Sequence, residues 1–289
     1  GRELAIKVLL DSHKDKPEVI QRFVEEAQIG GQLQHPGIAP VYELGQLADR
    51  RPFFSMKLVK RRTLSALLGE REDSPEDRTK FLGIFEQICQ TMAYAHSRGV
   101  IHRDLKPANI MVGAFGEVQV MDWGLAKVLS EGGVADEKKA TTRYKDVSAI
   151  QTMRSSGSDV AGSIGSVGSI TRMGSVMGTP AYMPPEQALG EIDRLDERSD
   201  VFGLGAILAE ILTGKPPYVG ADGNEVVRLA SRGQLGDCFQ RLDESAADQE
   251  LLEMTKQMLA VEPEDRLRNA GVVAKHLTKY LSGVPERLK

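Results

Sequence analysis

The sequence predicts a bilobal α+β fold, with a small, mainly β N-terminal lobe over residues 1–60 and a larger helical lobe over residues 61–280. Three observations support this prediction. Short β-prone apolar runs crowd the N-terminal part, long helical stripes of apolar residues dominate the rest, and a Gly- and Ser-rich stretch at about 130–177 interrupts the second lobe. Residues 281–289 are expected to begin a polar linker.

The N-terminal lobe is expected to contain three strands and one helix. Residues 4–10 are an apolar run broken only by Lys7, which predicts a buried strand that carries one cation into a polar place. Pro17 can begin a helix because its fixed φ suits the first helical position. The apolar residues that follow at helical spacing are Val19, Ile20, Phe23, Val24 and Ala27. Residues 38–44 and 53–59, separated by a polar turn, predict two antiparallel strands.

The second lobe begins with a long helix. Apolar residues recur at helical spacing over 81–95, and Gly99 can supply the left-handed stop after them. Three short β-prone pieces follow, at residues 100–101, 110–112 and 118–121. Residues 200–213 predict another apolar helix closed by Gly214, and the pattern stays mostly helical to about Tyr280.

The stretch between residues 130 and 177 differs from the rest in composition. It consists largely of Gly, Ser, Thr and scattered charges, and its segment GSIGSVGSI approaches low complexity. Such a segment cannot bury enough apolar surface to offset the entropy lost on ordering. We therefore expect a mobile, disordered insertion within the second lobe.

Composition excludes several classes of partner. Lys plus Arg count 37 against 41 for Asp plus Glu, a net charge of −4, so no nucleic-acid partner is expected. Cys89 and Cys238 lie far apart in apolar contexts, which fits a reducing cytoplasm better than a disulfide framework or a zinc site. No run of about 18 apolar residues exists, and the start GRELAIKVLL lacks a secretory signal. We expect no membrane segment within this chain and a cytoplasmic location.

Two short motifs gather groups that phosphoryl transfer needs. The chain reads HRDLKPAN at residues 102–109 and MDWG at residues 121–124. The reaction needs a group that orients the attacking hydroxyl, ligands for magnesium and a cation near the nucleotide phosphates. Asp104 can accept the proton of the hydroxyl, and Asn109 and Asp122 offer the oxygen ligands that magnesium prefers. The two motifs therefore predict a phosphotransferase site.

Further motifs lie in order along residues 1–280: LAIK before these two, then GTPAYMPPE, SDVFGLG and EPEDR. Together with HRDLKPAN and DWG, they make the chain resemble a eukaryotic-type (Hanks-type) protein serine/threonine kinase of bacterial appearance. The resemblance implies the bilobal protein-kinase fold. It also implies an enzyme that uses ATP and Mg²⁺ to phosphorylate Ser and Thr hydroxyls of protein substrates in bacterial signalling.

The resemblance assigns the catalytic roles by position. Lys7 of LAIK would hold the nucleotide phosphates and pair with a glutamate of the first helix. In RFVEEA that glutamate is Glu26, with Glu25 as the alternative. Asp104 would be the catalytic base, and Lys106 would contact the transferred phosphate. The magnesium ligands would be Asn109 and Asp122.

The adenine pocket follows from the same resemblance. Met56 would sit at the back of this pocket, and Lys57 to Val59 would form the hinge whose backbone reads the adenine edge. Ala5 and Met111 would sandwich the ring between the lobes. These positions imply that ATP binds between the two lobes.

Other residues would support the site. Thr179 of GTPAY would support the catalytic loop and help form the substrate pocket. Glu186 of PPE would pair with Arg266 in the helical lobe. Asp200 would brace the catalytic loop from beneath.

Arg103 directly precedes the proposed base. An exposed cation there can dock a phosphate added to the activation segment, which would order that segment. The candidate acceptors are Thr171 and Ser175, with Ser163, Ser166 and Ser169 behind them. Autophosphorylation between two copies of the chain would imply a homodimer.

The chain departs from the family pattern in several places. The glycine-rich loop should precede LAIK, so we expect the chain to be a fragment of a longer protein, weak or inactive without that loop. Trp123 follows Asp122 where the family usually has phenylalanine, so the pocket behind the metal site is expected to differ in shape. From Asp122 to Glu186 is 186 − 122 = 64 positions, about double the usual spacing.

Two other functions stay open from the sequence. A pseudokinase that scaffolds partners would be expected to lack a catalytic residue, whereas Lys7, Asp104 and Asp122 are all present. A small-molecule phosphotransferase of the same superfamily would not need the GTPAYMPPE segment, which suits an extended peptide. Kinases of this appearance often continue into repeats, sensor modules or a membrane span, so the full-length protein could be membrane-anchored.

Overall fold

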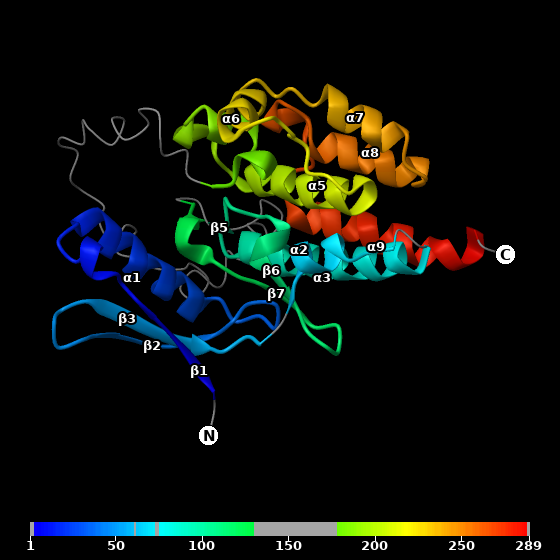
Figure 1. The fold of residues 1–289 in the computed structure, drawn as a ribbon. Coiled ribbons are helices and arrows are strands. Elements are labelled where there is room, and N and C mark those ends of the chain that lie inside the picture. The colour runs from blue at the N-terminus through cyan, green and yellow to red at the C-terminus, as the bar shows by residue number, and fades with distance from the viewer. Residues whose placement is uncertain (1–2, 61, 73–74, 130–177, 288–289) are drawn as a thin grey trace, which may run out of the picture.

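The computed structural model describes residues 3–60, 62–72, 75–129 and 178–287. Over these residues the bilobal α+β prediction is confirmed, with a sheet and one long helix at the N-terminus and a helical body after it (Figure 1). The predicted insertion lies outside the described residues, and so do Thr171 and Ser175. Within the described ranges, no helix combines the length and the apolar character needed to cross a bilayer.

The N-terminal lobe is an antiparallel sheet covered by one helix. In order across the sheet, the strands are β1 (Leu4–Val8), β3 (Pro52–Lys57) and β2 (Val41–Gln46), and α1 (Pro17–Gln32) packs along one face (Figure 1). Ala5 pairs with Met56 and Lys7 with Phe54. These four side chains share one face, because alternate residues of a strand point the same way. The rings of Phe23 and Phe54 lie 5.1 Å apart in a small core between helix and sheet.

Short strands follow where the lobes meet. The second sheet contains β4 (Arg62–Thr63), β6 (Ile110–Val112) and β7 (Val118–Val120), and β5 (Val100–Ile101) pairs with β8 (Lys127–Val128). A bridge between Ile38 and Val120 ties the loop after α1 to β7. The short helix α2 (Leu64–Gly69), which the sequence did not predict, begins where Thr63 Oγ1 accepts a hydrogen bond from the Ala66 amide at 3.1 Å.

Helix α5 (Glu197–Thr213) is the centre of the C-terminal lobe, with α3 and α9 on one side and α6, α7 and α8 on the other (Figure 1). The other helices are α3 (Pro75–Ser97), α4 (Pro185–Ala188), α6 (Gly223–Ser231), α7 (Gly236–Asp243), α8 (Gln249–Met258) and α9 (Ala270–Arg287). Every residue of α5 from Ser199 to Ala209 is buried. Gly205 permits close packing, because a Cβ there would lie 2.8 Å from Met258 Cβ. Gly214 closes α5 at φ 79°.

One-turn 3₁₀ helices lie at η1 (Asp11–His13), η2 (Pro107–Asn109), η3 (Trp123–Leu125), η7 (Pro180–Tyr182), η8 (Ile192–Arg194) and η9 (Pro263–Asp265). Two helix boundaries differ from the prediction. Helix α3 begins at Pro75, because proline suits a first helical position although the first turn lacks an apolar stripe. Helix α9 runs to Arg287, so the linker predicted over 281–289 is helical in its described part. Buried Leu277 and Tyr280 and partly buried Leu281 continue the apolar stripe of α9 into it.

Candidate active site

The loop between β5 and β6 is held in place by the central helix. The backbone amides of His102 and Arg103 donate hydrogen bonds to the Asp200 carboxylate at 2.7 and 2.8 Å. His96 Nε2 donates to the same carboxylate at 3.0 Å, since its Nδ1 accepts from the Ala270 amide. Burial alone would raise the pKa of Asp200, but these hydrogen bonds and the nearby histidines outweigh it and hold that pKa below its ordinary value. The loop between β5 and β6 is therefore fixed to α5.

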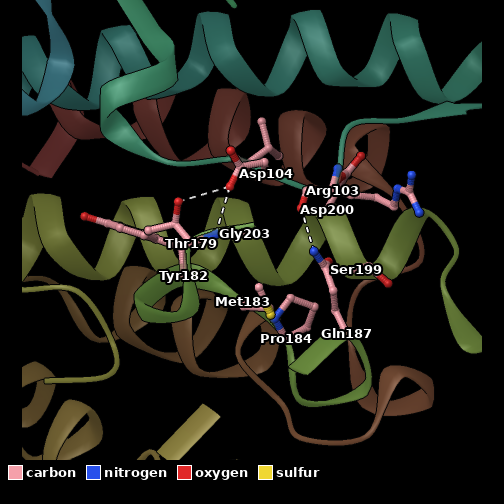
Figure 2. Close-up of a pocket in the computed structure, with 11 residues that line it drawn as sticks. Arg103, Asp104, Thr179, Tyr182, Met183, Pro184, Gln187, Ser199, Asp200 and Gly203 are labelled. Carbon is pink, nitrogen blue, oxygen red and sulfur yellow. Dashed lines mark hydrogen bonds between the residues drawn. The ribbon is translucent and has the colours of Figure 1, made fainter. Parts of the chain in front are cut away.

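The Asp104 carboxylate has partners on both oxygens. Its Oδ1 accepts hydrogen bonds from the amide and the hydroxyl of Thr179, at 3.0 and 3.2 Å (Figure 2). Its Oδ2 accepts from Lys106 Nζ at 2.7 Å and from Asn109 Nδ2 at 3.1 Å. Lys106 Nζ also donates to Thr179 Oγ1 at 2.6 Å. The structure thus brings three other predicted site residues together around the carboxylate of Asp104, whose side chain is 9% exposed.

The two candidate metal ligands lie on neighbouring segments. The amide of Met121, directly before Asp122, donates to the Asn109 carbonyl at 2.8 Å. Asn109 Nδ2 donates to Asp104, which turns the amide oxygen away from that residue. A Cβ on Gly124 would lie 3.3 Å from Asp122 Oδ1, so the glycine leaves room beside this carboxylate. Within the described residues, no three His, Cys, Asp or Glu side chains form a group that could hold a metal ion. The pair Asn109 and Asp122 fits magnesium, because this ion is usually bound by one or two carboxylates together with water and phosphate oxygens.

Lys7 forms an ion pair with α1. Its Nζ lies 2.7 Å from Glu26 Oε1 and 2.8 Å from Glu26 Oε2. Burial raises the pKa of Glu26, Lys7 opposes this shift, and the nearby Asp122 adds to it. Glu25, the alternative partner, instead accepts a hydrogen bond from Gln21 at 3.1 Å. The ion pair of Lys7 and Glu26 joins β1 to α1 close to the Asp122 carboxylate.

The residues assigned to the adenine pocket lie on both lobes. Ala5 and Met56 are paired across β1 and β3. Strand β3 ends at Lys57, whose amide donates to the Pro40 carbonyl at 3.1 Å, and half-buried Val59 follows. Met111 is half-buried in β6. A cavity of about 30 Å³ lies at Met56, and its lining includes Glu26, Phe54, Asp122 and Trp123.

Glu186 and Arg266 form a buried, bidentate ion pair. The guanidinium nitrogens lie 2.7 and 2.8 Å from the two carboxylate oxygens, and the side chains are 1% and 0% exposed. The Ser199 hydroxyl also donates to Glu186 at 3.0 Å, and the guanidinium donates to three backbone carbonyls. Both charges are thus fully compensated, as burial of an ion pair requires. The pair ties the start of α4 to the segment after α8.

Arg103 is less exposed than the sequence suggests. Its side chain is half-buried, and its Nε donates to the Leu125 carbonyl at 2.5 Å. Gln187 Nε2 donates to the Arg103 carbonyl at 2.8 Å (Figure 2). The expectation of an exposed cation is corrected, because packing against the segment after Asp122 buries part of this side chain.

Sequence reasoning missed several contributors to the site. His96, which binds Asp200, follows Met92 by one turn on the apolar stripe of α3, and a polar residue on a buried face is a signal for a buried partner. The Tyr182 hydroxyl donates to Glu210 at 2.6 Å, and burial together with Glu210 raises the pKa of Tyr182. Neither Tyr182 nor Gln187 carried a comparable signal in the sequence.

The fold and this constellation define a protein kinase domain. The family model described as "Protein kinase domain" matches residues 1–168 and 159–278. The chain belongs to this family.

Two of the curated relatives that the chain matches are bacterial serine/threonine-protein kinases. The chain is similar to serine/threonine-protein kinase PknD of Protochlamydia amoebophila, with 31% identity over 99% of this chain and 28% of that protein. It is also similar to serine/threonine-protein kinase PknB of Mycobacterium leprae, with 32% identity over 98% of this chain and 40% of that protein. The chain therefore spans well under half the length of these relatives.

Proposed function

We propose that the protein is a serine/threonine protein kinase, which transfers the γ-phosphate of ATP to serine and threonine hydroxyls of proteins. The observation that carries this proposal is the Asp104 carboxylate, which Lys106, Asn109 and Thr179 hold in one orientation. A fixed carboxylate can accept the hydrogen bond of the incoming hydroxyl, and phosphoryl transfer depends mainly on positioning and charge neutralisation. The relatives are serine/threonine-protein kinases by name, which supports the same acceptor class.

The acceptor side of the reaction is assigned to the catalytic loop. Asp104 receives the proton of the attacking hydroxyl as the hydroxyl oxygen bonds to the γ-phosphorus and the bond from that phosphorus to the ADP oxygen breaks. Lys106, which contacts both Asp104 and Thr179, neutralises charge on the phosphoryl group. Thr179 keeps the carboxylate turned toward the acceptor.

The nucleotide side is assigned to the N-terminal lobe and the Asp122 loop. Lys7, oriented by Glu26, binds the nucleotide phosphates. Asn109 and Asp122 would hold magnesium, which supplies positive charge to the phosphate oxygens when bound. The adenine ring is assigned to Ala5, Met56, Met111 and the backbone of Lys57 and Val59.

A protein substrate is favoured over a small metabolite. A pocket beside Asp104 is lined by the Thr179–Pro184 segment, by Gln187 and by α5 (Figure 2). The GTPAYMPPE segment, which contributes to this lining, suits an extended peptide, and the relatives are serine/threonine-protein kinases by name. We assign regulation to autophosphorylation at Thr171 or Ser175 between two copies of the chain, within bacterial signalling in the cytoplasm.

Labelled ATP tests the proposal. Protein expressed from its full coding sequence is incubated with ATP, Mg²⁺ and a protein mixture, and phosphoamino acids are analysed. We expect phosphoserine or phosphothreonine from the wild type, none from Asp104→Asn, and wild-type amounts from Asp193→Asn, which makes the same change at an exposed position. Transfer that survives in Asp104→Asn would refute the mechanism, and label only on small molecules would favour a small-molecule phosphotransferase. Mixing Asp104→Asn with wild type tests transfer between copies, and peptide mapping tests Thr171 and Ser175.

A further inference from the structure

The C-terminal end of helix α5 carries a half-buried carboxylate, that of Glu210. The last turn of α5, residues 210–213, reads EILT and contains no basic side chain. The helix dipole places partial negative charge at this end, and the last carbonyls lack partners within the helix. A carboxylate is disfavoured at such a position unless a cation lies nearby. Glu210 therefore needs compensation from another part of the chain.

Arg71, two residues after α2, supplies that cation. Its Nη1 donates hydrogen bonds to the Glu210 carbonyl at 3.1 Å and to the Ile211 carbonyl at 2.8 Å. The guanidinium lies over Gly214, where a Cβ would come within 2.8 Å of Nη2. Burial raises the pKa of Glu210, and the charge of Arg71 opposes this rise. Arg71 thus caps α5 and favours the charged form of the Glu210 carboxylate.

The Glu210 carboxylate in turn holds the segment beside the proposed base. The Tyr182 hydroxyl donates to Glu210 Oε2 at 2.6 Å, and a hydrogen bond to a charged acceptor is stronger than one to a neutral acceptor. Tyr182 ends η7, and its amide donates to the Thr179 carbonyl at 3.0 Å. Thr179 binds Asp104 Oδ1 through its amide and its hydroxyl (Figure 2). A continuous series of contacts therefore connects Arg71 to Asp104.

We propose that Arg71 is a positioning residue for the protein acceptor, because it fixes the Glu210 carboxylate and thereby the Thr179–Tyr182 segment beside Asp104. This inference rests on the proposed function, since it takes the pocket beside Asp104 as the place of the acceptor. The nucleotide is assigned to other residues, so loss of Arg71 is expected to weaken use of the acceptor and not of ATP. A purely structural cap would stabilise α5 without affecting the position of η7.

Three variants, each in protein expressed from its full coding sequence, test this role. Arg71→Met removes the charge and the donors but keeps an extended side chain, and Arg71→Lys retains the cation. Arg78→Met is the matched control. Arg78 on α3 donates to the Ala246 carbonyl at 2.6 Å, so its replacement removes the same charge and the same kind of contact from another part of the lobe.

Native-state hydrogen exchange reports local opening of η7. The probe is the Met183 amide, which closes η7 by donating to the Pro180 carbonyl at 3.3 Å. A loss equal to about one hydrogen bond is expected to speed its exchange about five-fold in Arg71→Met. The expected change is less than about two-fold in Arg71→Lys, which keeps a cation beside Glu210. Arg78→Met is expected to leave exchange at Met183 unchanged.

Steady-state kinetics with dephosphorylated casein as acceptor give a second readout. Arg71→Met is expected to raise the KM for casein about five-fold and to leave the KM for ATP unchanged, with Arg71→Lys close to wild type. Arg78→Met is expected to change neither KM, although it removes the same charge. An equal rise of the casein KM in Arg71→Met and Arg78→Met would assign the effect to net charge and overturn the inference.

The exchange data contain two further outcomes that would overturn it. The first is exchange at Met183 that stays at the wild-type rate in Arg71→Met. The second is equal acceleration at Met183 and at the Gly99 amide, which donates to the His96 carbonyl at the end of α3, since that pattern reports a general loss of stability.

The double variant Arg71→Met/Tyr182→Phe tests the route of the effect. Tyr182→Phe removes the hydroxyl that binds Glu210, so adding Arg71→Met to it is expected to change exchange at Met183 by less than about two-fold. A full five-fold effect of Arg71→Met in the Tyr182→Phe background would show that Arg71 does not act through Glu210 and Tyr182.

Asp104→Asn separates this inference from the proposed function. If Asp104→Asn retains phosphate transfer, the proposed function fails, whatever the exchange at Met183. If Asp104→Asn is inactive while exchange at Met183 is the same in Arg71→Met and wild type, only the role of Arg71 fails.

Discussion

Asp200→Asn tests how far the central helix α5 holds the loop between β5 and β6. The Asp200 side chain is 1% exposed and accepts hydrogen bonds from His96 Nε2 and from the amides of His102 and Arg103, at 3.0, 2.7 and 2.8 Å. An asparagine has a single acceptor oxygen, so at least one of these donors must face the new NH₂ group. Keeping the oxygen toward His96 and His102 leaves the Arg103 amide unpaired.

The cost of this change can be worked from the contacts. An orphaned buried donor costs about 1–3 kcal/mol, and each of the two retained bonds loses about 1 kcal/mol when its acceptor is no longer charged. The expected loss in the free energy of unfolding is about 3–5 kcal/mol, a large part of the 5–15 kcal/mol of a typical domain. Urea unfolding at pH 7 measures it. The control Asp193→Asn, at an exposed position, is expected to change stability by no more than about 0.5 kcal/mol.

The difference in unfolding free energy between wild type and Asp200→Asn is expected to depend on pH. The pKa of Asp200 in the folded protein is lowered, so the carboxylate contributes stability that is present above its unfolded-state pKa of about 3.9. That contribution is lost as pH falls through the folded-state pKa. The stability gap between wild type and Asp200→Asn is therefore expected to hold from neutral pH to about pH 5 and to narrow below about pH 4. A gap at pH 7 no larger than that of Asp193→Asn, or one that widens in acid, would refute the reasoning.

Glu26→Gln is expected to leave the free energy of unfolding at pH 7 unchanged or raised, while phosphate transfer falls about 100-fold through misplaced nucleotide phosphates. Burial raises the pKa of Glu26, so the stabilising contribution of Glu26 is present below its unfolded-state pKa and is lost as pH rises through its folded-state pKa. A clear loss of stability in Glu26→Gln at pH 7 would contradict this expectation. Arg266→Met is expected to cost about 3–5 kcal/mol, because it leaves Glu186 charged and buried without its partner. The double variant Glu186→Met/Arg266→Met should unfold at higher urea than Arg266→Met alone, and the reverse order would count against the pairing argument. Burial raises the thiol pKa of Cys89 and Cys238, and it raises that of Cys238 to about 11. Neither thiol should therefore react with Ellman's reagent at pH 8 before the protein unfolds. Reaction of either thiol in the native protein would exclude such burial.

Elements with a strong local signal could be predicted from the sequence. Gly99 and Gly214 end α3 and α5 in the left-handed conformation, at φ 71° and 79°, because glycine alone adopts it without strain. Helix ends that depend on packing could not be predicted in the same way. Helix α9 continues past Tyr280 because Leu281 still contacts the core, and that contact is a property of the tertiary structure.

The residues of the candidate site also include some that could be predicted from the sequence and some that could not. Lys7 and Glu26 could be selected because their roles require particular side chains at motif positions, and the structure places them 2.7 Å apart. The contacts of Gln187 with the Arg103 carbonyl and of Trp123 with the Val120 carbonyl could not be selected. A backbone carbonyl is present at every position, so an acceptor of this kind has no sequence signature.

The long spacing between Asp122 and Glu186 is compatible with a well-placed candidate site because the chain is anchored on both sides of residues 130–177. Before this segment, the Leu129 amide donates to the Gly99 carbonyl at 2.8 Å, next to the β5–β8 pair. After it, Thr179 is bound to Asp104, and Glu186 is bound to Arg266. The entropy of closing a connection grows only with the logarithm of its length, about 0.6 kcal/mol for each doubling. Several hydrogen bonds and a buried ion pair outweigh that cost, so the position of Thr179 against the Asp104 carboxylate does not require the segment to have the family's usual length.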